Sequence, residues 1–138
     1  MTTFDEAELA AYQLWYDNVP SLLDEWRFGY EAKKEPEEGQ LWARISFQNT
    51  DGGQYSLGAV GERKFRRQAV IAVQIFTPRG EGPSRANQVA QAVVELFEGA
   101  AHSALDFHDA VVRPTPPSEE EKFSQLLVTI DCDFFQTR

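Results

Sequence analysis

The fold is decided by residues 63–99, which read RKFRRQAVIAVQIFTPRGEGPSRANQVAQAVVELFEG. The first part, residues 63–77, is rich in Val, Ile and Phe and predicts a long β-strand. The PRGEG sequence that follows is typical of a turn, and Pro83 stands where a helix would begin. Apolar residues then recur at the spacing of an amphipathic helix up to Gly99, which is well placed to end it; they are Ala86, Val89, Ala90, Val93, Val94 and Phe97.

A second helix is predicted near the N-terminus, over residues 4–16, where apolar and aromatic residues recur at helical spacing. Thr3 is positioned to cap it, and the Asn-Val-Pro sequence at 18–20 stops it, because a residue before proline is pushed out of the helical region. Residues 21–30 fit either a short helix or an irregular segment that ends in a strand.

Alternating apolar and polar residues predict further strands at 41–48, 105–112 and 123–135. The glycine-rich piece at 49–66 predicts an extended β-hairpin arm, with a short extended stretch at 55–60. Charged or proline-rich loops are expected at 31–40 and 113–122.

These elements predict an α+β fold in the order α-β-β-α-β-β. Mostly short connections favour a largely antiparallel sheet of about four strands, with both helices packed on one face. A chain of 138 residues corresponds to one domain, covering residues 1–138.

Composition excludes several classes of protein. The single cysteine, Cys132, excludes a disulfide framework and a multi-cysteine zinc site. No apolar run approaches the ~20 residues that a membrane span needs. A net charge of −9 and a pI near 4.7 argue against a dedicated nucleic-acid binder. The acidic N-terminus is unlike a basic signal peptide, which predicts that the chain stays in the cytosol where it is made.

No catalytic, cofactor or metal site is predicted. His102, Asp106, His108 and Asp109 lie within eight residues but lack any known ligand spacing, so structural or surface roles are expected. Cys132 lies between two aspartates, which raise the pKa of a thiol and disfavour the nucleophilic thiolate, and its strand position predicts core packing. Neither a phosphate-binding loop nor a nucleophile elbow is present.

Charge is distributed unevenly along the chain. Residues 1–50 carry 10 acids and 4 bases (−6), residues 51–90 carry 3 and 6 (+3), and residues 91–138 carry 9 and 3 (−6). Such a bipolar chain can stack on copies of itself or on a partner of opposite sign. The alternative is a solvated strand end with favourable cross-strand pairs. Because exposed charges contribute little to folding, changing Arg66 and Arg67 to Glu is expected to leave the melting temperature nearly unchanged.

Aromatic residues crowd the first 55 positions and are too many for one helix and one strand face to bury. Partly exposed aromatics usually mark a protein interface. The competing interpretation is that residues 18–30 fold over the core and cover them. The residues are Phe4, Trp15, Tyr16, Trp26, Phe28, Tyr30, Trp42 and Tyr55.

The chain resembles the tail terminator (tail completion) proteins of long-tailed bacteriophages, prophages and gene-transfer agents. The resemblance rests on the N-terminal helix before the turn at 18–20, the glycine-containing hairpin, and the strand-turn-helix VQIFTPRGEG at 73–82. In that family such a strand ends in Phe-x-Pro-x-Gly, followed by a helix that opens with small and polar residues, here from Ser84 onward. The alternating closing strand also fits.

The resemblance implies a non-enzymatic virion tail protein, assembled in the host cytoplasm. It would form a ring, hexameric in the family, that caps the tail tube and meets the head connector. DNA would only pass through a lumen made repellent by Asp131 and Asp133 or by the acidic loops, Glu35–Glu38 and Glu119–Glu121. The alternative is a small non-catalytic adaptor of cellular origin. The predicted protein-interface residues are Arg63, Lys64, Arg66, Arg67, Glu119, Glu120, Glu121, Tyr55 and Trp42.

Overall fold

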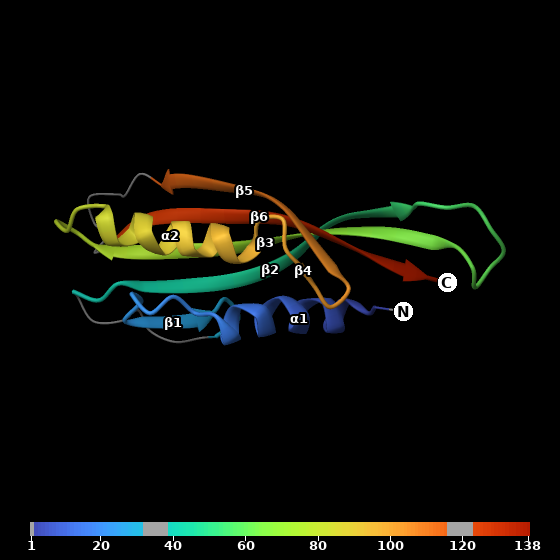
Figure 1. Cartoon of the computed structure of the whole chain (residues 1–138), viewed down its shortest axis with the longest axis horizontal. Coiled ribbons are helices and arrows are strands. Elements are labelled where there is room, and N and C mark those ends of the chain that lie inside the picture. Colours follow the sequence, from blue (N-terminus) through green and yellow to red (C-terminus); the bar gives the residue numbers. More distant parts are fainter. Residues whose placement is uncertain (1, 32–38, 116–122) are drawn as a thin grey trace.

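The computed structural model describes residues 2–31, 39–115 and 123–138. In this described part, two helices and six strands follow one another along the chain (Figure 1). They are α1 (Phe4–Asp17), β1 (Glu25–Phe28), β2 (Trp42–Gln54), β3 (Lys64–Pro78), α2 (Ser84–Phe97), β4 (Ala101–His102), β5 (Leu105–Thr115) and β6 (Phe123–Thr137).

The strands form one sheet in the order β1-β2-β3-β6-β5-β4. The prediction of about four strands in the order α-β-β-α-β-β was wrong, because two short edge strands, β1 and β4, extend the sheet to six among the described residues. The sheet is mixed, since β1 runs parallel to β2 while the other neighbours are antiparallel. A strand of four residues or two carries too little alternation to be detected in sequence.

Both helices have the predicted ends. Thr3 caps α1, where its Oγ1 accepts a hydrogen bond of 3.1 Å from the Glu6 backbone N–H. Gly99 follows α2 with a φ of +71°, a left-handed conformation that glycine adopts at little cost. Local sequence therefore fixes the start of α1 and the end of α2.

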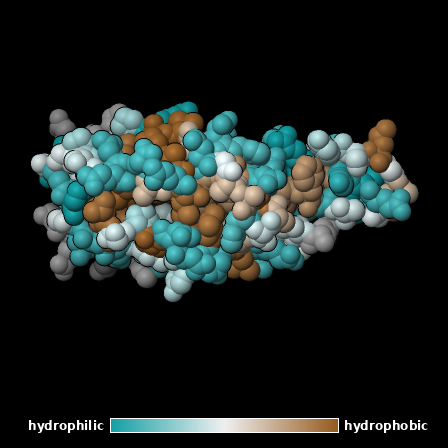
Figure 2. Space-filling model, in the orientation of Figure 1, coloured by the Kyte–Doolittle hydropathy of each residue, from teal (hydrophilic) through white to brown (hydrophobic). Residues whose placement is uncertain are grey.

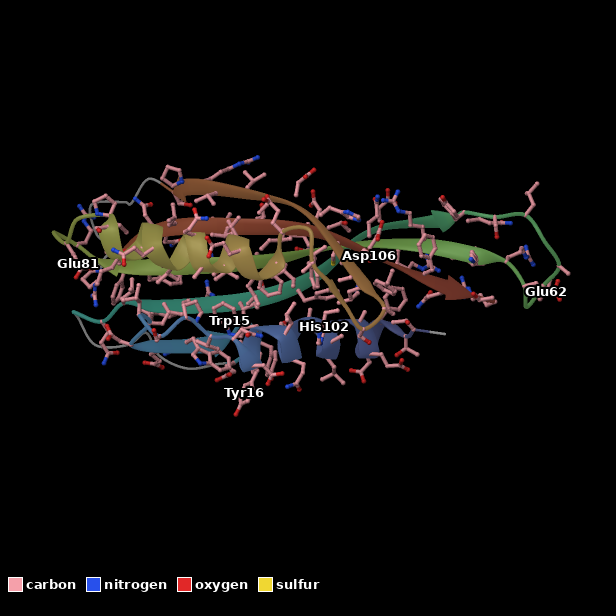
Figure 3. All side chains as sticks on the ribbon, viewed as in Figure 1. Trp15, Tyr16, Glu62, Glu81, His102 and Asp106 are labelled. Atoms are coloured by element: carbon pink, nitrogen blue, oxygen red, sulfur yellow. The ribbon has the colours of Figure 1, made fainter. Side chains whose placement is uncertain are left out.

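One face of the sheet carries the main hydrophobic core, to which both helices contribute. Ala7, Ala11 and Trp15 of α1 and the buried stripe of α2 belong to the same cluster as the inward residues of β2, β3, β5 and β6. Trp15 is fully buried. Figure 3 shows it on the sheet side of α1, whereas Tyr16 points outward.

The other face carries a smaller cluster near one end of the molecule. The Trp42 and Phe76 rings stack with centroids 4.0 Å apart, and Phe123 meets Trp42 edge-on at 5.8 Å. The Arg27 guanidinium lies 4.9 Å from the Trp42 ring centroid. Trp42 is only 2% exposed, so it stabilises the fold and offers no surface to a partner.

β2 and β3 continue past the core as a protruding arm, on which β6 also ends (Figure 1). β2 and β3 remain paired as far as Gln54 opposite Phe65, and β6 follows β3 to Thr137 opposite Lys64. Residues 55–63 form the loop at the tip, where Figure 3 labels Glu62. The arm thus has three strands at its base and a loop at its end.

Candidate interaction surfaces

The tip of the arm exposes large apolar side chains. Leu57 is 94% exposed, Val60 83% and Tyr55 66%. Figure 2 shows hydrophobic atoms at this far end of the molecule, away from the core. The Tyr55 ring meets the Phe135 ring edge-on at 5.2 Å, which attaches one side of the loop to β6. We call Tyr55, Leu57 and Val60 the arm tip. Apolar groups this exposed are typical of a surface that a partner covers.

An ion-pair cluster holds the base of the arm to β6 and β5. Arg66 donates from Nε at 2.9 Å and from Nη2 at 2.8 Å to Oδ2 of Asp133, and His108 Nε2 lies 3.2 Å from the same oxygen. The Asp133 side chain is 8% exposed, whereas that of Arg66 is 41% exposed. Asp133 is therefore neutralised within the chain, and of the two aspartates predicted to line a lumen only Asp131 is exposed.

Arg67 is also engaged within its own chain. Its Nε donates to Gln136 Oε1 at 2.9 Å, and Gln136 in turn donates to the Thr2 carbonyl at 3.0 Å. The guanidinium lies 5.6 Å from the Phe4 ring centroid. For Arg66 and Arg67 the structure favours the second interpretation of the basic segment, cross-strand pairing, because both side chains join β3 to β6. Sequence could not identify the partners, since they are 67 and 69 residues away.

Three other basic side chains lie nearer the tip. Lys64 and Arg138 are exposed and Arg63 is half-buried. The Arg138 backbone N–H donates to the Arg63 carbonyl at 2.9 Å, and the Arg138 guanidinium lies 4.8 Å from the Phe65 ring. The Arg63 Nε is buried without a hydrogen-bond partner among the described residues. Lys64, Arg63 and Arg138 are thus the basic residues nearest the arm tip.

The predicted acidic counterparts lie outside the described residues, both Glu119–Glu121 and the acids of the loop at 32–38. Acidic side chains do gather on α1, whose sequence FDEAELAAYQLWYD contains four acids and no base. Its outer face exposes Leu9 (59%) and Tyr16 (64%), with exposed Gln13 between them. We call Leu9, Gln13 and Tyr16 the α1 outer face. Sequence alone did not distinguish this face from the buried one, because apolar and aromatic residues lie on both sides of the helix.

The aromatic residues of the first 30 positions are partly covered, as expected if residues 18–30 fold over the core. The Trp26 ring meets the rings of Trp15 and Tyr16 edge-on, each at 6.0 Å. β1 thus folds over α1 and shields Trp15. Tyr30 stacks on Phe28 at 5.4 Å yet remains 71% exposed. Exposure is therefore confined to the outermost rings of this group.

The histidines and aspartates of 102–109 do not converge. His102 and Asp106 lie on β4 and β5 (Figure 3), while His108 faces Asp133. Within the described ranges, no group of three or more His, Cys, Asp or Glu side chains could hold a metal ion. Burial, followed by the charges of Asp133 and Asp131, raises the pKa of the Cys132 thiol to about 12. Such a thiol is a core side chain and a poor nucleophile.

Neither helix of the described part is long and apolar enough to cross a membrane. No curated protein sequence matches the chain. Several solved structures are similar to the chain. One of them matches with a TM-score of 0.55 and 18% identity, over 97% of this chain and 92% of that one, which shows a shared fold. The family model described as phage tail terminator protein matches residues 28–124, which is well over half of the sequence. The chain therefore belongs to the phage tail terminator family and has a structural role in the phage tail.

Proposed function

We propose that copies of this chain assemble into a ring, hexameric as the family resemblance implies, that caps the tail tube and joins it to the head connector. The ring would contact the tail tube protein on one side and a head-completion protein on the other. The chain acts through shape and surface charge and needs no cofactor.

The observation that carries this proposal is the arm. A closed ring of identical subunits requires two different complementary surfaces on each subunit. The arm tip, with Leu57 94% exposed, is a protruding surface of one kind. The body offers a second kind of surface, acidic and less protruding. A chain with this asymmetry is suited to head-to-tail contacts.

The charge of the whole chain supports passage of DNA through the ring. With a net charge of −9 on each chain, an assembled ring would be strongly negative and would repel the DNA backbone. Asp131 is exposed on the sheet face opposite the helices and adds to this repulsion.

The proposed ring can be tested by measuring the mass of the assembly that the full chain forms. We expect native mass spectrometry and light scattering to show a closed oligomer, either of the purified chain or of the chain bound to tail tubes from the phage or prophage that encodes it. Negative-stain images should place this oligomer at one end of the tube. A chain that stays monomeric and does not bind tubes contradicts the proposal.

Deletion of the gene tests the joining role separately. Heads and tails should then accumulate unjoined, and a plasmid copy of the gene should restore joined particles. Normal joining without the gene would contradict this part of the proposal while leaving ring formation open to the mass measurement.

A further inference from the structure

Two exposed apolar surfaces lie on different parts of one chain. The arm tip projects along the long axis beyond the N-terminal end of α1, so it does not cover the α1 outer face of its own chain (Figure 1). The α1 outer face presents Leu9, 59% exposed, and Tyr16, 64% exposed, which lie about two turns apart on the same stripe. Each surface is a few side chains wide, a protrusion in one case and a helical ridge in the other.

The surroundings of the two surfaces have opposite charge. Next to the arm tip lie Arg63, Lys64 and Arg138, against one acid in the tip loop, Glu62. Around the α1 outer face lie Asp5, Glu6 and Asp17, all exposed, with no base in the helix. Apolar centres with rims of opposite sign are the arrangement expected of two surfaces that bind each other.

We propose that the arm tip of one copy docks on the α1 outer face of the next copy. This inference rests on the proposed ring and names the contact that would build it. Leu57 and Val60 would cover Leu9 and Tyr16, while Lys64 and its basic neighbours would face the acids of α1. Because the two surfaces differ, each copy both gives an arm and receives one, and the contacts are satisfied when the ring closes.

Cysteine pairing between differently tagged copies tests the contact. One chain carries Leu57→Cys and the other Leu9→Cys; both positions are exposed, and the native Cys132 is buried. Mixed and oxidised under assembly conditions, the two chains should form a disulfide that joins the two tags. The matched control is Val111→Cys on β5, also exposed at 40%, which should not pair with Leu57→Cys.

A second variant, Leu57→Asp, should weaken assembly about tenfold or more, since it replaces an apolar anchor by a charge that α1 repels. Its melting temperature should match that of the native chain. An oligomer that forms without the Leu57→Cys to Leu9→Cys disulfide, or whose arm pairs with the tube protein instead, overturns the inference and leaves the ring standing. A chain that is monomeric in every condition overturns the ring as well.

Discussion

Gly29, directly after β1, lies where the neighbouring strand β2 approaches closely. A Cβ atom there would lie 3.0 Å from the Ser46 Cβ and 3.3 Å from the Ile45 carbonyl oxygen. The Gly29 N–H donates to that same carbonyl at 2.6 Å, so the two backbones cannot separate without losing the bond. We expect Gly29→Ala to lower the free energy of unfolding by about 1–3 kcal/mol, measured by urea denaturation.

Gly53 supplies the matched control. A Cβ at Gly53 meets nothing within 4 Å, and its φ lies outside the left-handed region. Gly53→Ala should change stability by no more than about 0.5 kcal/mol. Equal losses in the two variants would show that steric crowding at Gly29 is not the cause.

The ion pair between Arg66 and Asp133 can be tested by reversing the charge of Arg66. Arg66→Glu would place a carboxylate against Asp133, whose side chain is 8% exposed. Because Arg66 itself is partly solvated, we expect a loss of about 1–3 kcal/mol in unfolding free energy. Lys64→Glu, at an exposed neighbouring position, should cost about 0.5 kcal/mol or less. Identical melting temperatures for the two variants would refute the ion-pair cluster.

Cys132 and Tyr12 make stability depend on pH in the alkaline range. Burial is the main cause that raises both pKa values to about 12, from ordinary values of 9.0 and 10.0. Unfolded chains therefore lose these protons first, so stability is complete below pH 9 and falls as the pH rises toward 12. Between pH 8 and 10.5, the free energy of unfolding should fall by about 1–2 kcal/mol less in Cys132→Ala than in the native chain. Parallel pH profiles would exclude a role for the thiol.

At the scale of the element, local sequence fixed the helices and the centres of the long strands. Thr3 and Gly99 act within a few residues of the ends they define. The ends of β2 could not be predicted, because Gly52 and Gly53 are typical of a turn yet pair with Arg67 and Arg66 of β3. The pairing of β2 with β3 shifts register between Asn49 and Asp51, and such a shift can be seen only when both strands are in place.

The short strands and the candidate surfaces depend on contacts between distant residues. β1 has four residues and exists because β2 lies alongside it. The exposure of the arm tip could be predicted from sequence, since a glycine-rich arm has no core to bury Leu57. The ion pair of Arg66 with Asp133 could not be predicted, because nothing near Arg66 in the sequence points to Asp133.

The arm tip and the core should respond differently to substitution, although both belong to the β2–β3 hairpin. Leu57→Ser with Val60→Ser should leave the free energy of unfolding within about 0.5 kcal/mol, since both side chains are more than four-fifths exposed. Ile71→Ala, at a fully buried position of β3, should cost about 2–5 kcal/mol. A large loss from the arm variant in thermal or urea unfolding would mean that the tip packs within its own chain.

For the whole molecule, the separation of charge predicts that assembly depends on salt. If basic arms face acidic helices in the ring, raising the salt concentration from about 0.05 M to 0.5 M shortens the screening length several-fold and should weaken assembly. Sedimentation velocity at the two concentrations measures this. The monomer's unfolding free energy should change far less. Assembly that strengthens with salt would indicate a contact governed by apolar burial alone.

β3 and β6 face each other without a register shift, from Lys64 opposite Thr137 to Pro78 opposite Phe123. Two strands of 15 residues make a ribbon about 50 Å long. Because the pairing is continuous, the ribbon links the hairpin end of the subunit to its opposite end through backbone hydrogen bonds. If the subunits join heads to tails as proposed, this ribbon would be the part of each subunit that carries mechanical force from one neighbour to the other.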